Sequence, residues 1–452
     1  MNVINETIER LKKSNCESDT TFFQAVQEVL HSIKPVLQRD AKYNQYRIVE
    51  RLTTPDRIFK FKVVWMDDKQ NIQVNTGYRV QFNNALGPYK GGLRFHPSVN
   101  AGILQFLGFE QIFKNALTGL QIGGGKGGSD FDPKGKSDNE IMNFCKAFML
   151  ELHKYIGPSI DIPAGDIGVG AREIGYLFGA YKKLKGTFEG ILTGKPYEMG
   201  GSLIRPEATG YGVVYFTDEM LKKADIYDGF KNKICTVSGA GNVAMFTIEK
   251  LYAMGATPVS CSDSQGTIYD SNGVDLELLK EIKLHKRQSL KEYIKVHKDA
   301  VYTKVENYPE GGHAAWQIPC HCAFPCATQN ELTLVDAKAL QANGCISITE
   351  GANMPSTPEA VAYILKSNML FAPAKAANAG GVAVSQLEMS QNAGKIKWSA
   401  AKVESMLEHI MRNICTEVHK TAIEYDVAGN YVDGANILSF KKVADAMMHE
   451  GM

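Results

Sequence analysis

A short apolar strand, followed by a glycine-rich turn and a helix, constrains the fold of this chain more than any other segment. Residues 233–237 are predicted to form the strand, and Gly239, Gly241 and Ala244 follow it with the spacing G-x-G-x-x-A. After the helix, a second strand is predicted over residues 257–261. This order of elements is typical of the βαβ unit that opens a dinucleotide-binding domain.

Each position in the glycine turn has a physical role in that interpretation. Gly239 makes the turn, Gly241 lets the backbone approach a pyrophosphate, and Ala244 permits close packing of helix on strand. The helix N-terminus at Asn242 and Val243 attracts the phosphates. The alternative is an accidental glycine turn in some other α/β fold.

A lysine in a second glycine run, Gly123 to Gly128, is the strongest candidate for chemistry. The glycines around Lys126 remove local side-chain bulk, and a lysine that loses water has its pKa lowered and can act as a base. The run is not a nucleotide P-loop, because Leu120 and Gly127 stand where that motif requires Gly and Ser or Thr. The alternative is a tight turn with a solvated lysine.

Composition excludes several classes of protein. The chain has 452 residues, which predicts two or three domains, and its formal net charge of +1 gives no basic field for nucleic acid. No apolar run is long enough to span a membrane, and the N-terminus does not resemble a signal peptide. We therefore expect no nucleic-acid or membrane partner, and a cytoplasmic location.

The cysteines indicate a reduced compartment rather than a disulfide framework, because they are nine in number and scattered. Cys320, His321, Cys322 and Cys326 lie close enough to suggest zinc, but no second ligand pair lies nearby. We favour a buried strand end for this segment and expect no metal.

The first half of the chain predicts a mixed sheet. Residues 59–63 and 72–83 alternate as two strands around a polar turn, which indicates a hairpin, and a helix is expected over residues 103–117. Helices are also expected near residue 20, ending by Pro35, and over residues 399–424.

Further polar residues accompany Lys126. Lys90 and Asp166 are flanked by glycines, and Gln111 and Lys114 share a face of the predicted helix. Taken singly, each is more often a solvated or turn residue.

Together with these residues, long motifs make the chain resemble the hexameric glutamate dehydrogenases of the Glu/Leu/Phe/Val dehydrogenase superfamily, NADP type, from about residue 20 to the end. The motifs are Gly87 to Pro97, Gly108 to Gln111, Gly123 to Pro133, Pro163 to Tyr176, Arg205 to Gly212, Pro325 to Asn330, Glu350 to Pro355, and Asn378 to Val382.

The resemblance implies an α/β fold with three parts. Residues 1–200 are expected to form a substrate-binding and oligomerisation domain with a mixed sheet, and residues 201–425 a Rossmann-like NADP-binding domain. Residues 426–452 are expected to form a C-terminal helix that returns to the first domain.

The resemblance also implies roles for individual residues. Lys126 is the catalytic amine and Asp166 the proton shuttle. The remaining substrate-binding residues are Lys90 and Ser385 for the distal carboxylate, Gln111 and Lys114 for the α-carboxylate, and Val382. The cofactor-binding residues include Arg205, Thr209, Asn353 and Asn378, together with the glycine turn.

The choice of nicotinamide cofactor depends on the end of the second nucleotide strand. Asp263 at this position favours NAD by the simple rule, whereas the Ser262 hydroxyl is expected to face a 2′-phosphate in the NADP-using branch. Lys283, Lys286 and Arg287 supply positive charge downstream, although they also suit a solvated helix end. We favour NADP, with the Asp263 carboxylate turned away and bound to backbone N–H groups.

We therefore expect an NADP-dependent glutamate dehydrogenase that interconverts 2-oxoglutarate and ammonium with L-glutamate, serves ammonia assimilation and forms a homo-hexamer. The alternatives are NAD or dual cofactor use, a dehydrogenase for leucine or phenylalanine, and a silent nucleotide- or glutamate-binding regulator. Lys90 with Ser385 opposes an apolar substrate, and intact Lys126 with Asp166 opposes a silent protein.

Overall fold

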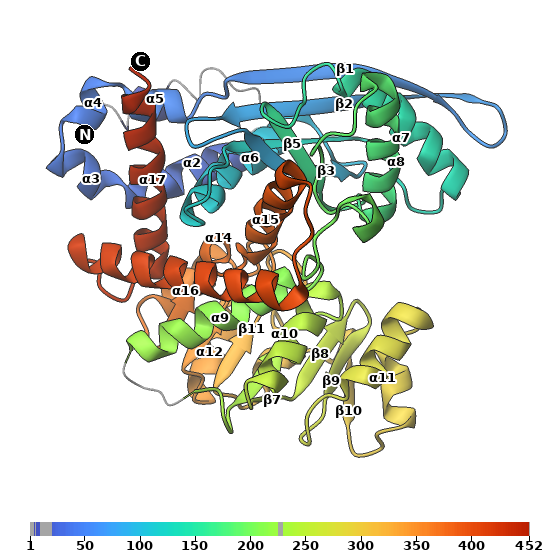
Figure 1. Cartoon of the computed structure of the whole chain (residues 1–452). Helices are drawn as coiled ribbons and strands as arrows, with labels where there is room; N and C mark the ends of the chain where they lie inside the picture. The colour runs from blue at the N-terminus through green and yellow to red at the C-terminus, as the bar shows by residue number, and fades with distance from the viewer. Residues whose placement is uncertain (1–3, 5, 10–19, 225–228, 452) are drawn as a thin grey trace. The chain divides into compact units, whose positions relative to one another are not determined.

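The computed structural model describes residues 4, 6–9, 20–224 and 229–451, which divide into two compact units (Figure 1). Unit 1 comprises Met1–Arg205, Val382–Val403 and Asn436–Met452, and unit 2 comprises Pro206–Gly381 and Glu404–Ala435. The units differ from the expected segments 1–200, 201–425 and 426–452, because the chain crosses between them four times. Among the described residues, no helix combines the length and apolar character that crossing a membrane requires.

Unit 1 is built on a five-stranded sheet with helices against it. Its elements are α2 (Thr20–Ser32), α3 (Lys34–Arg39), α4 (Lys42–Gln45), α5 (Ile48–Leu52), β1 (Arg57–Met66), β2 (Ile72–Asn83), β3 (Tyr89–Phe95), α6 (Ala101–Leu117), β4 (Gly124–Ser129), α7 (Asp138–Leu152), β5 (Asp161–Gly165), α8 (Ala171–Lys185) and the 3₁₀ helix η2 (Tyr197–Met199).

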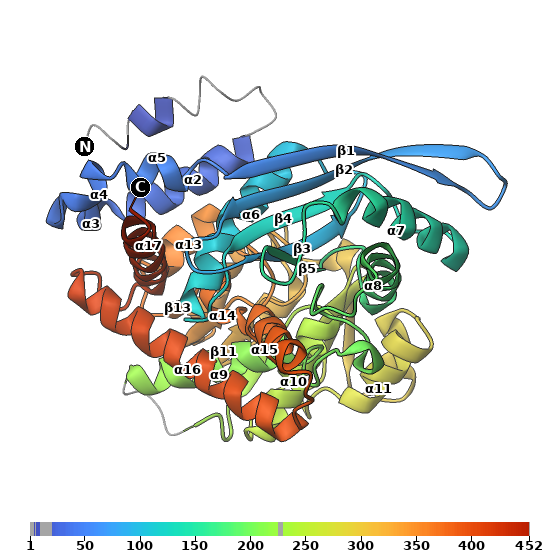
Figure 2. The ribbon, with the colours of Figure 1, turned by 45° about the horizontal axis from the view of Figure 1, so that its top comes forward.

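The sheet of unit 1 is mixed, as predicted. Its strand order is β1-β2-β4-β3-β5, and Figure 2 shows the strands side by side in this order. β1 and β2 form the expected antiparallel hairpin, β2 pairs antiparallel with β4, and β4-β3-β5 are parallel. The glycine run around Lys126 is therefore strand β4, and Lys90 lies in strand β3. The alternative of a tight turn with a solvated lysine at Lys126 is wrong, because pairing with neighbouring strands overrides the weak strand propensity of glycine.

Aromatic clusters hold helices on the sheet of unit 1. Phe144 on α7 stacks on Phe131 with ring centroids 3.8 Å apart, within a core that also contains residues of β1, β3 and α8. Phe109 on α6 meets Phe82 of β2 at 5.8 Å and Phe22 of α2 at 5.7 Å. Each cluster buries apolar rings between a helix and its neighbours, which fixes the positions of α7 and α6.

The C-terminal segment packs on the start of unit 1. Helix α17 (Tyr431–His449) carries Asp445, which accepts a hydrogen bond from the Tyr43 hydroxyl at 3.0 Å. Asn436 on the same helix donates to the Ser32 hydroxyl at 3.0 Å. These side chains join residues about 400 positions apart in sequence.

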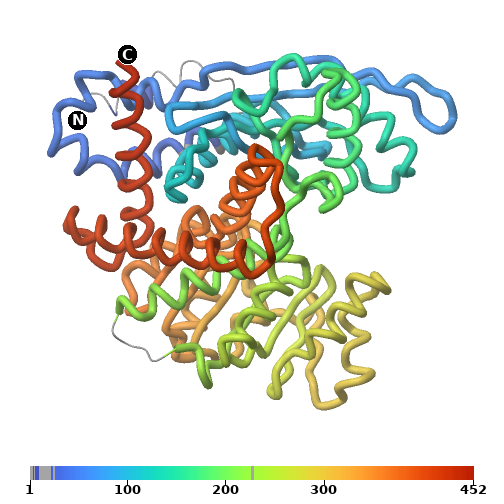
Figure 3. The backbone as a smooth tube through the Cα atoms, viewed as in Figure 1, coloured from blue at the N-terminus to red at the C-terminus, as the bar shows by residue number. Residues whose placement is uncertain are grey.

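Unit 2 contains a parallel sheet and a small antiparallel sheet. Its backbone is traced mainly in green, yellow and orange in Figure 3. Its elements are α9 (Ala208–Lys223), β6 (Ile234–Val237), α10 (Asn242–Ala253), β7 (Thr257–Pro258), β8 (Ser260–Asp263), β9 (Gly266–Tyr269), α11 (Leu276–Lys280), η3 (Glu281–His285), η4 (Leu290–Lys295), β10 (Val301–Lys304), η5 (Val305–Asn307), η6 (Ala314–Gln317), β11 (Cys322–Phe324), α12 (Leu334–Ala342), β12 (Ser347–Thr349), α13 (Pro358–Ile364), β13 (Leu370–Ala372) and α14 (Ala374–Ala377). Three helices run across the unit boundaries: α17, α15 (Gly380–Gly394) and α16 (Ala400–Glu424).

The parallel sheet confirms the predicted βαβ unit. Its order is β13-β12-β11-β6-β7, and β6 and β7 are joined through α10. Cys322 and Phe324 of β11 belong to one apolar core while Ala323 between them belongs to another, so both faces of the sheet are covered. The predicted strand 257–261 is divided, because residues on either side of Val259 pair in different sheets.

The cysteine segment lies in the sheet, as expected for a buried strand end. Cys320, Cys322 and Cys326 are buried, and the Thr236 hydroxyl lies 3.3 Å from the Cys320 sulfur. No group of His, Cys, Asp or Glu in the described ranges is arranged to hold a metal ion.

Candidate active site

Strand β4 places Lys126 in the middle of the sheet of unit 1. Its neighbours are glycines because the strands and α6 approach the backbone closely: a Cβ added at Gly91 would lie 1.6 Å from the carbonyl oxygen of Gly125, and one added at Gly127 would lie 2.8 Å from that of Tyr78. The glycines therefore serve the packing of strands, in addition to leaving the Lys126 side chain without bulky neighbours along its own strand.

Lys126, Asp166 and Arg94 form a compact group in unit 1. The Lys126 Nζ lies 3.3 Å from Asp166 Oδ2, and the Arg94 Nε donates to the same oxygen at 2.7 Å. Lys126 is 6% exposed. The sequence did not single out Arg94 as a site residue, although a charged residue in the otherwise apolar end of β3 is a usable signal.

The electrostatics of this group suit proton transfer. Burial lowers the pKa of Lys126 and the charge of Arg94 lowers it further, while Asp166 opposes both. Burial raises the pKa of Asp166, but the charges of Lys126 and Arg94 outweigh it, so the pKa of this carboxyl lies below its ordinary value. Asp166 is thus ionised near neutral pH, beside a lysine that is unusually ready to lose its proton.

Gln111 and Lys114 lie on α6, as predicted. The Gln111 side chain donates to Asn115 Oδ1 at 2.7 Å, and Asn115 in turn donates to the carbonyl oxygens of Gly123 and Lys90. Burial, followed by the charge of Lys126, lowers the pKa of Lys114 to about 8. Asn115, which sequence reasoning missed, ties the helix to both lysine-bearing strands.

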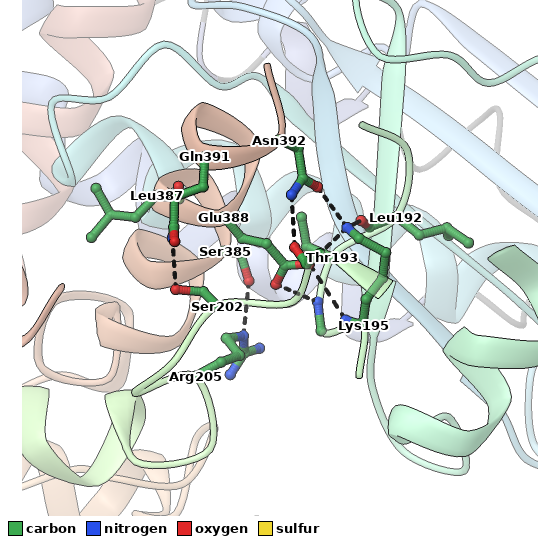
Figure 4. Close-up of polar contacts among 12 residues, drawn as sticks. Leu192, Thr193, Lys195, Ser202, Arg205, Ser385, Leu387, Glu388, Gln391 and Asn392 are labelled. Carbon is green, nitrogen blue, oxygen red and sulfur yellow. Dashed lines mark hydrogen bonds and ion pairs between the residues drawn. The ribbon is translucent and has the colours of Figure 1, made fainter. Parts of the chain in front are cut away.

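Lys90 is fully buried and its Nζ donates to the Thr193 hydroxyl at 2.7 Å. Ser385 on α15 accepts a hydrogen bond from Arg205 Nε at 3.0 Å (Figure 4). Arg205 was predicted to bind cofactor, and in unit 1 its guanidinium is bonded to the serine predicted to hold substrate. No sequence signal pointed to Thr193, because it lies 103 positions from Lys90 in an unremarkable loop. Val382, the other predicted substrate residue, is half-buried on α15.

The glycine turn of unit 2 has the geometry that the motif predicts. Gly239 has φ of 87°, a left-handed conformation that favours glycine, and Ala244 is fully buried under the sheet. A Cβ added at Gly241 would meet no atom within 4 Å. The fold therefore leaves space beside Gly241. This space lies at the N-terminus of α10, where Asn242 and Val243 begin the helix, and it suits a phosphate group.

Other residues predicted to bind the cofactor lie in unit 2. Asn378 Nδ2 donates to Asn353 Oδ1 at 2.9 Å, whereas Asn378 Oδ1 is buried with no hydrogen-bond partner in the described part of the chain. An orphaned buried acceptor suits a ligand that donates a hydrogen bond. Thr209 is half-buried in the first turn of α9.

The Asp263 carboxylate is bound to backbone N–H groups, as predicted. Its carboxylate accepts from the backbone N–H of Gln265 at 2.9 Å and of Leu290 at 3.1 Å, and it pairs with Lys283 Nζ at 2.9 Å. These hydrogen bonds and the lysine outweigh burial and lower the pKa of Asp263. Ser262 is 2% exposed and its hydroxyl accepts from the Gly239 N–H at 2.8 Å, so part of its hydrogen-bonding capacity holds the glycine turn.

Lys286 and Arg287, which follow Lys283 in the sequence, were also predicted to bind a 2′-phosphate. Lys286 Nζ lies 3.4 Å from Glu281 in an exposed ion pair, and Arg287 is exposed with φ of 52°. Exposed pairs hold their partners weakly, so both cations are available to an anion.

A parallel sheet with a glycine turn at a helix N-terminus, together with a buried lysine–carboxylate pair on a second unit, defines a dinucleotide-dependent dehydrogenase. The sequence profile of Glutamate/Leucine/Phenylalanine/Valine dehydrogenase matches residues 200–451, and that of the Glu/Leu/Phe/Val dehydrogenase dimerisation domain matches residues 55–183. The chain belongs to this family.

Within this family, the chain is similar to NADP-specific glutamate dehydrogenases. The NADP-specific glutamate dehydrogenase of Helicobacter pylori is 57% identical over 431 residues, which are 95% of this chain and 96% of the relative. That of Escherichia coli is 51% identical over 441 residues, or 96% of each. Among solved structures, Plasmodium falciparum glutamate dehydrogenase has a TM-score of 0.95 at 49% identity and covers 100% of this chain and 95% of its own.

Proposed function

We propose that Lys126 and Asp166 carry the chemistry of a reversible reductive amination of 2-oxoglutarate with ammonium to L-glutamate. The chain is an NADP-dependent glutamate dehydrogenase, an oxidoreductase acting on the CH–NH2 group, and NADP is its cofactor. The observation that carries the residue assignment is the buried ion pair, in which Lys126 lies 3.3 Å from an Asp166 carboxylate that stays ionised.

In this mechanism the two residues move protons. During deamination, neutral Lys126 activates the water that attacks the iminium carbon; in the other direction, its ammonium form polarises the keto oxygen. Asp166 takes a proton from, or returns it to, the substrate nitrogen. NADPH, when bound, supplies the hydride that reduces the iminium carbon.

Two lysines of unit 1, Lys90 and Lys114, hold the two ends of a dicarboxylate. Lys90, which is hydrogen-bonded to Thr193, binds the distal carboxylate together with Ser385. Gln111 and Lys114 bind the α-carboxylate. A leucine or phenylalanine dehydrogenase has no use for a buried cation at position 90, because an apolar side chain cannot compensate its lost hydration. Initial rates with 2-oxoglutarate, ammonium and NADPH test the function, and no turnover would leave only a binding protein.

The Lys90→Leu, Ser385→Val double variant is expected to lose glutamate activity relative to apolar amino acids. Burying the distal carboxylate without partners costs several kcal/mol, while an apolar side chain gains from the new surface. The measurement is kcat/KM for glutamate against norvaline and methionine. An unchanged ratio would mean that these residues do not set specificity.

Lys283→Ala is expected to raise the KM for NADPH more than that for NADH. The substitution removes a cation and also leaves the Asp263 carboxylate without its ion-pair partner, so that its negative charge repels a 2′-phosphate. Lys286→Ala and Arg287→Ala remove cations only, so each is expected to have a smaller effect of the same sign. Charge-assisted contacts contribute roughly 1.5–3 kcal/mol each, so two of them give the native enzyme at least about a hundredfold preference for NADPH.

Lys291→Ala is the matched control for these variants, since it removes an exposed lysine of the same unit. If the Lys283, Lys286 and Arg287 variants change the KM for NADPH and the KM for NADH equally, these residues do not bind the 2′-phosphate.

The assembly is expected to be a homo-hexamer that works in the cytoplasm, in ammonia assimilation. An exposed apolar patch supports association: Val64 pairs with Val74 and Met66 with Ile72 across the β1–β2 hairpin, and all four side chains are exposed. Such a patch at the edge of a sheet favours burial against another subunit. Light scattering on the purified chain tests the hexamer.

A further inference from the structure

A buried ion pair lies beside the proposed substrate residues of unit 1. Lys195 Nζ donates to Glu388 Oε1 at 2.7 Å, to Asn392 Oδ1 at 2.7 Å and to the Leu192 carbonyl oxygen at 2.5 Å. The side chains of Lys195 and Glu388 are 1% and 0% exposed. Figure 4 shows Glu388 on the same helix as Ser385, facing the segment that carries Thr193 and Lys195.

Glu388 also holds the backbone of that segment. Its carboxylate accepts from the N–H of Gly194 at 2.9 Å and from that of Lys195 at 3.4 Å. Leu192 has φ of 60° and Gly194 has φ of 82°, so the residues on either side of Thr193 are left-handed. A left-handed non-glycine residue persists only where surrounding contacts enforce it, and the contacts of Glu388 and Lys195 do so here.

Thr193, held between these residues, is the link to Lys90. In the described part of the chain, the polar side-chain partner of Lys90 Nζ is the Thr193 hydroxyl, and no carboxylate forms an ion pair with this lysine. The position of the Lys90 ammonium thus depends on the segment that Glu388 fixes.

The charge of Lys90 depends on Glu388 as well. The charged groups that act on Lys90 are Glu388 from α15, Arg205, Arg79 from β2 and Asp161 from the adjacent strand β5. Arg79 and Asp161 are paired with each other. Burial lowers the pKa of Lys90, Glu388 is the charge that most opposes this shift, and Arg79 and Arg205 add to the lowering.

We propose that Glu388, through its ion pair with Lys195, is the positioning residue of the distal-carboxylate subsite: it fixes Thr193 and balances the positive charge around Lys90. This inference rests on the proposed function, in which Lys90 and Ser385 bind the distal carboxylate of 2-oxoglutarate.

The sign of the effect separates positioning from direct repulsion. Glu388 and a bound carboxylate carry like charges, so loss of the Glu388 charge by itself would tighten 2-oxoglutarate binding. Loss of the ordered Thr193 segment and of the Lys90 charge instead weakens 2-oxoglutarate binding. The proposal requires that this weakening exceeds the gain from removing the repulsion.

Glu388→Gln keeps the shape and an oxygen acceptor for Gly194 but removes the charge. The expected result is a KM for 2-oxoglutarate raised about tenfold or more, with a much smaller change in kcat. The KM for 2-oxovalerate, which lacks the distal carboxylate, is expected to change little. A lower KM for 2-oxoglutarate, or equal changes for both substrates, would overturn the proposal.

The pH profile provides a readout that a merely structural role would not move. The KM for 2-oxoglutarate rises as pH passes up through the Lys90 pKa, because the cation is lost. Without the Glu388 charge that pKa falls further, so the rise begins at lower pH in Glu388→Gln than in the native enzyme. Coincident profiles for the two proteins would contradict the charge-balancing role.

A second variant covers the case in which Glu388→Gln fails to fold because Lys195 is left as an unpaired buried cation. Glu388→Gln with Lys195→Gln replaces the ion pair by neutral amides, a change that is often tolerated in a protein interior. The same rise in KM for 2-oxoglutarate is expected, and its absence would equally refute the proposal. Asp218→Asn, which removes a buried carboxylate of unit 2 that is paired with Lys222 and Arg412, is the control for general destabilisation.

Lys90→Leu, assayed in parallel, separates the two levels of the argument. If this variant leaves the KM for 2-oxoglutarate unchanged, the proposed function of Lys90 fails. If Lys90→Leu raises the KM and Glu388→Gln does not, only the positioning role of Glu388 fails.

Discussion

Lys126→Ala is expected to lower kcat for glutamate oxidation by about 10²–10⁴-fold, the contribution typical of a positioned general base. The reason is that Lys126 is the one lysine paired with Asp166 in the described structure, and its amine is buried with a lowered pKa. NADPH binding is expected to be unchanged, since the glycine turn belongs to the other unit. Steady-state kinetics and fluorescence titration with NADPH measure the two quantities.

Lys134→Ala is the matched control for that variant, because Lys134 is an exposed lysine shortly after β4. It is expected to retain native rates. Near-native kcat in Lys126→Ala would remove this residue from the chemistry.

The same assignment fixes a pH dependence for the native enzyme. Deamination needs neutral Lys126, so its rate is expected to rise as pH increases through the lowered pKa of this amine. Arg94 and burial lower that pKa and Asp166 raises it, so loss of the Asp166 charge moves the rising limb to lower pH.

Asp166→Ser is expected to reduce kcat by a similar factor, about 10²–10⁴-fold, while dicarboxylate binding persists. The carboxylate handles protons, whereas Lys90, Lys114 and their neighbours hold the substrate. Calorimetric titration with glutarate, which has both carboxylates but no reacting carbonyl, measures binding apart from chemistry.

Asp132→Ser removes an exposed carboxylate that follows β4 shortly after its end, and this variant serves as the control. Retained chemistry in Asp166→Ser together with a large loss of glutarate binding would contradict the proton-shuttle role and assign Asp166 to substrate binding instead.

Local sequence patterns were sufficient for the elements with strong periodicity. The β1–β2 hairpin, helix α6 and the unit from β6 through α10 were predicted because alternation, helical spacing and glycine spacing each depend on neighbouring residues alone. β4 was misjudged because its glycines carry no strand signal of their own. Its structure comes from β2 and β3, which local patterns do not report.

The candidate site divides in the same way. Lys126, Lys90 and Asp166 were noticed because glycines surround them and because the family motifs contain them. Thr193, Lys195 and Glu388 were missed, since a threonine in a loop and a buried ion pair between residues 193 positions apart leave no local trace. The binding of Asp263 to backbone N–H groups was predicted, but its pairing with Lys283 was not, because it depends on where η3 places that side chain.

The glycine composition of β4 has a consequence for the order of folding. Four of its six residues are glycine, which lose much conformational entropy on ordering and offer no side chain to pack, so the strand has little tendency to form alone. It becomes ordered only between β2 and β3, and its residues pair with positions more than thirty places earlier in the chain. We therefore expect Lys126 to reach its place only when the flanking strands pair with β4. In a partly folded chain this residue is expected to be an ordinary, solvated lysine, and the reactive amine to arise with completion of the sheet of unit 1.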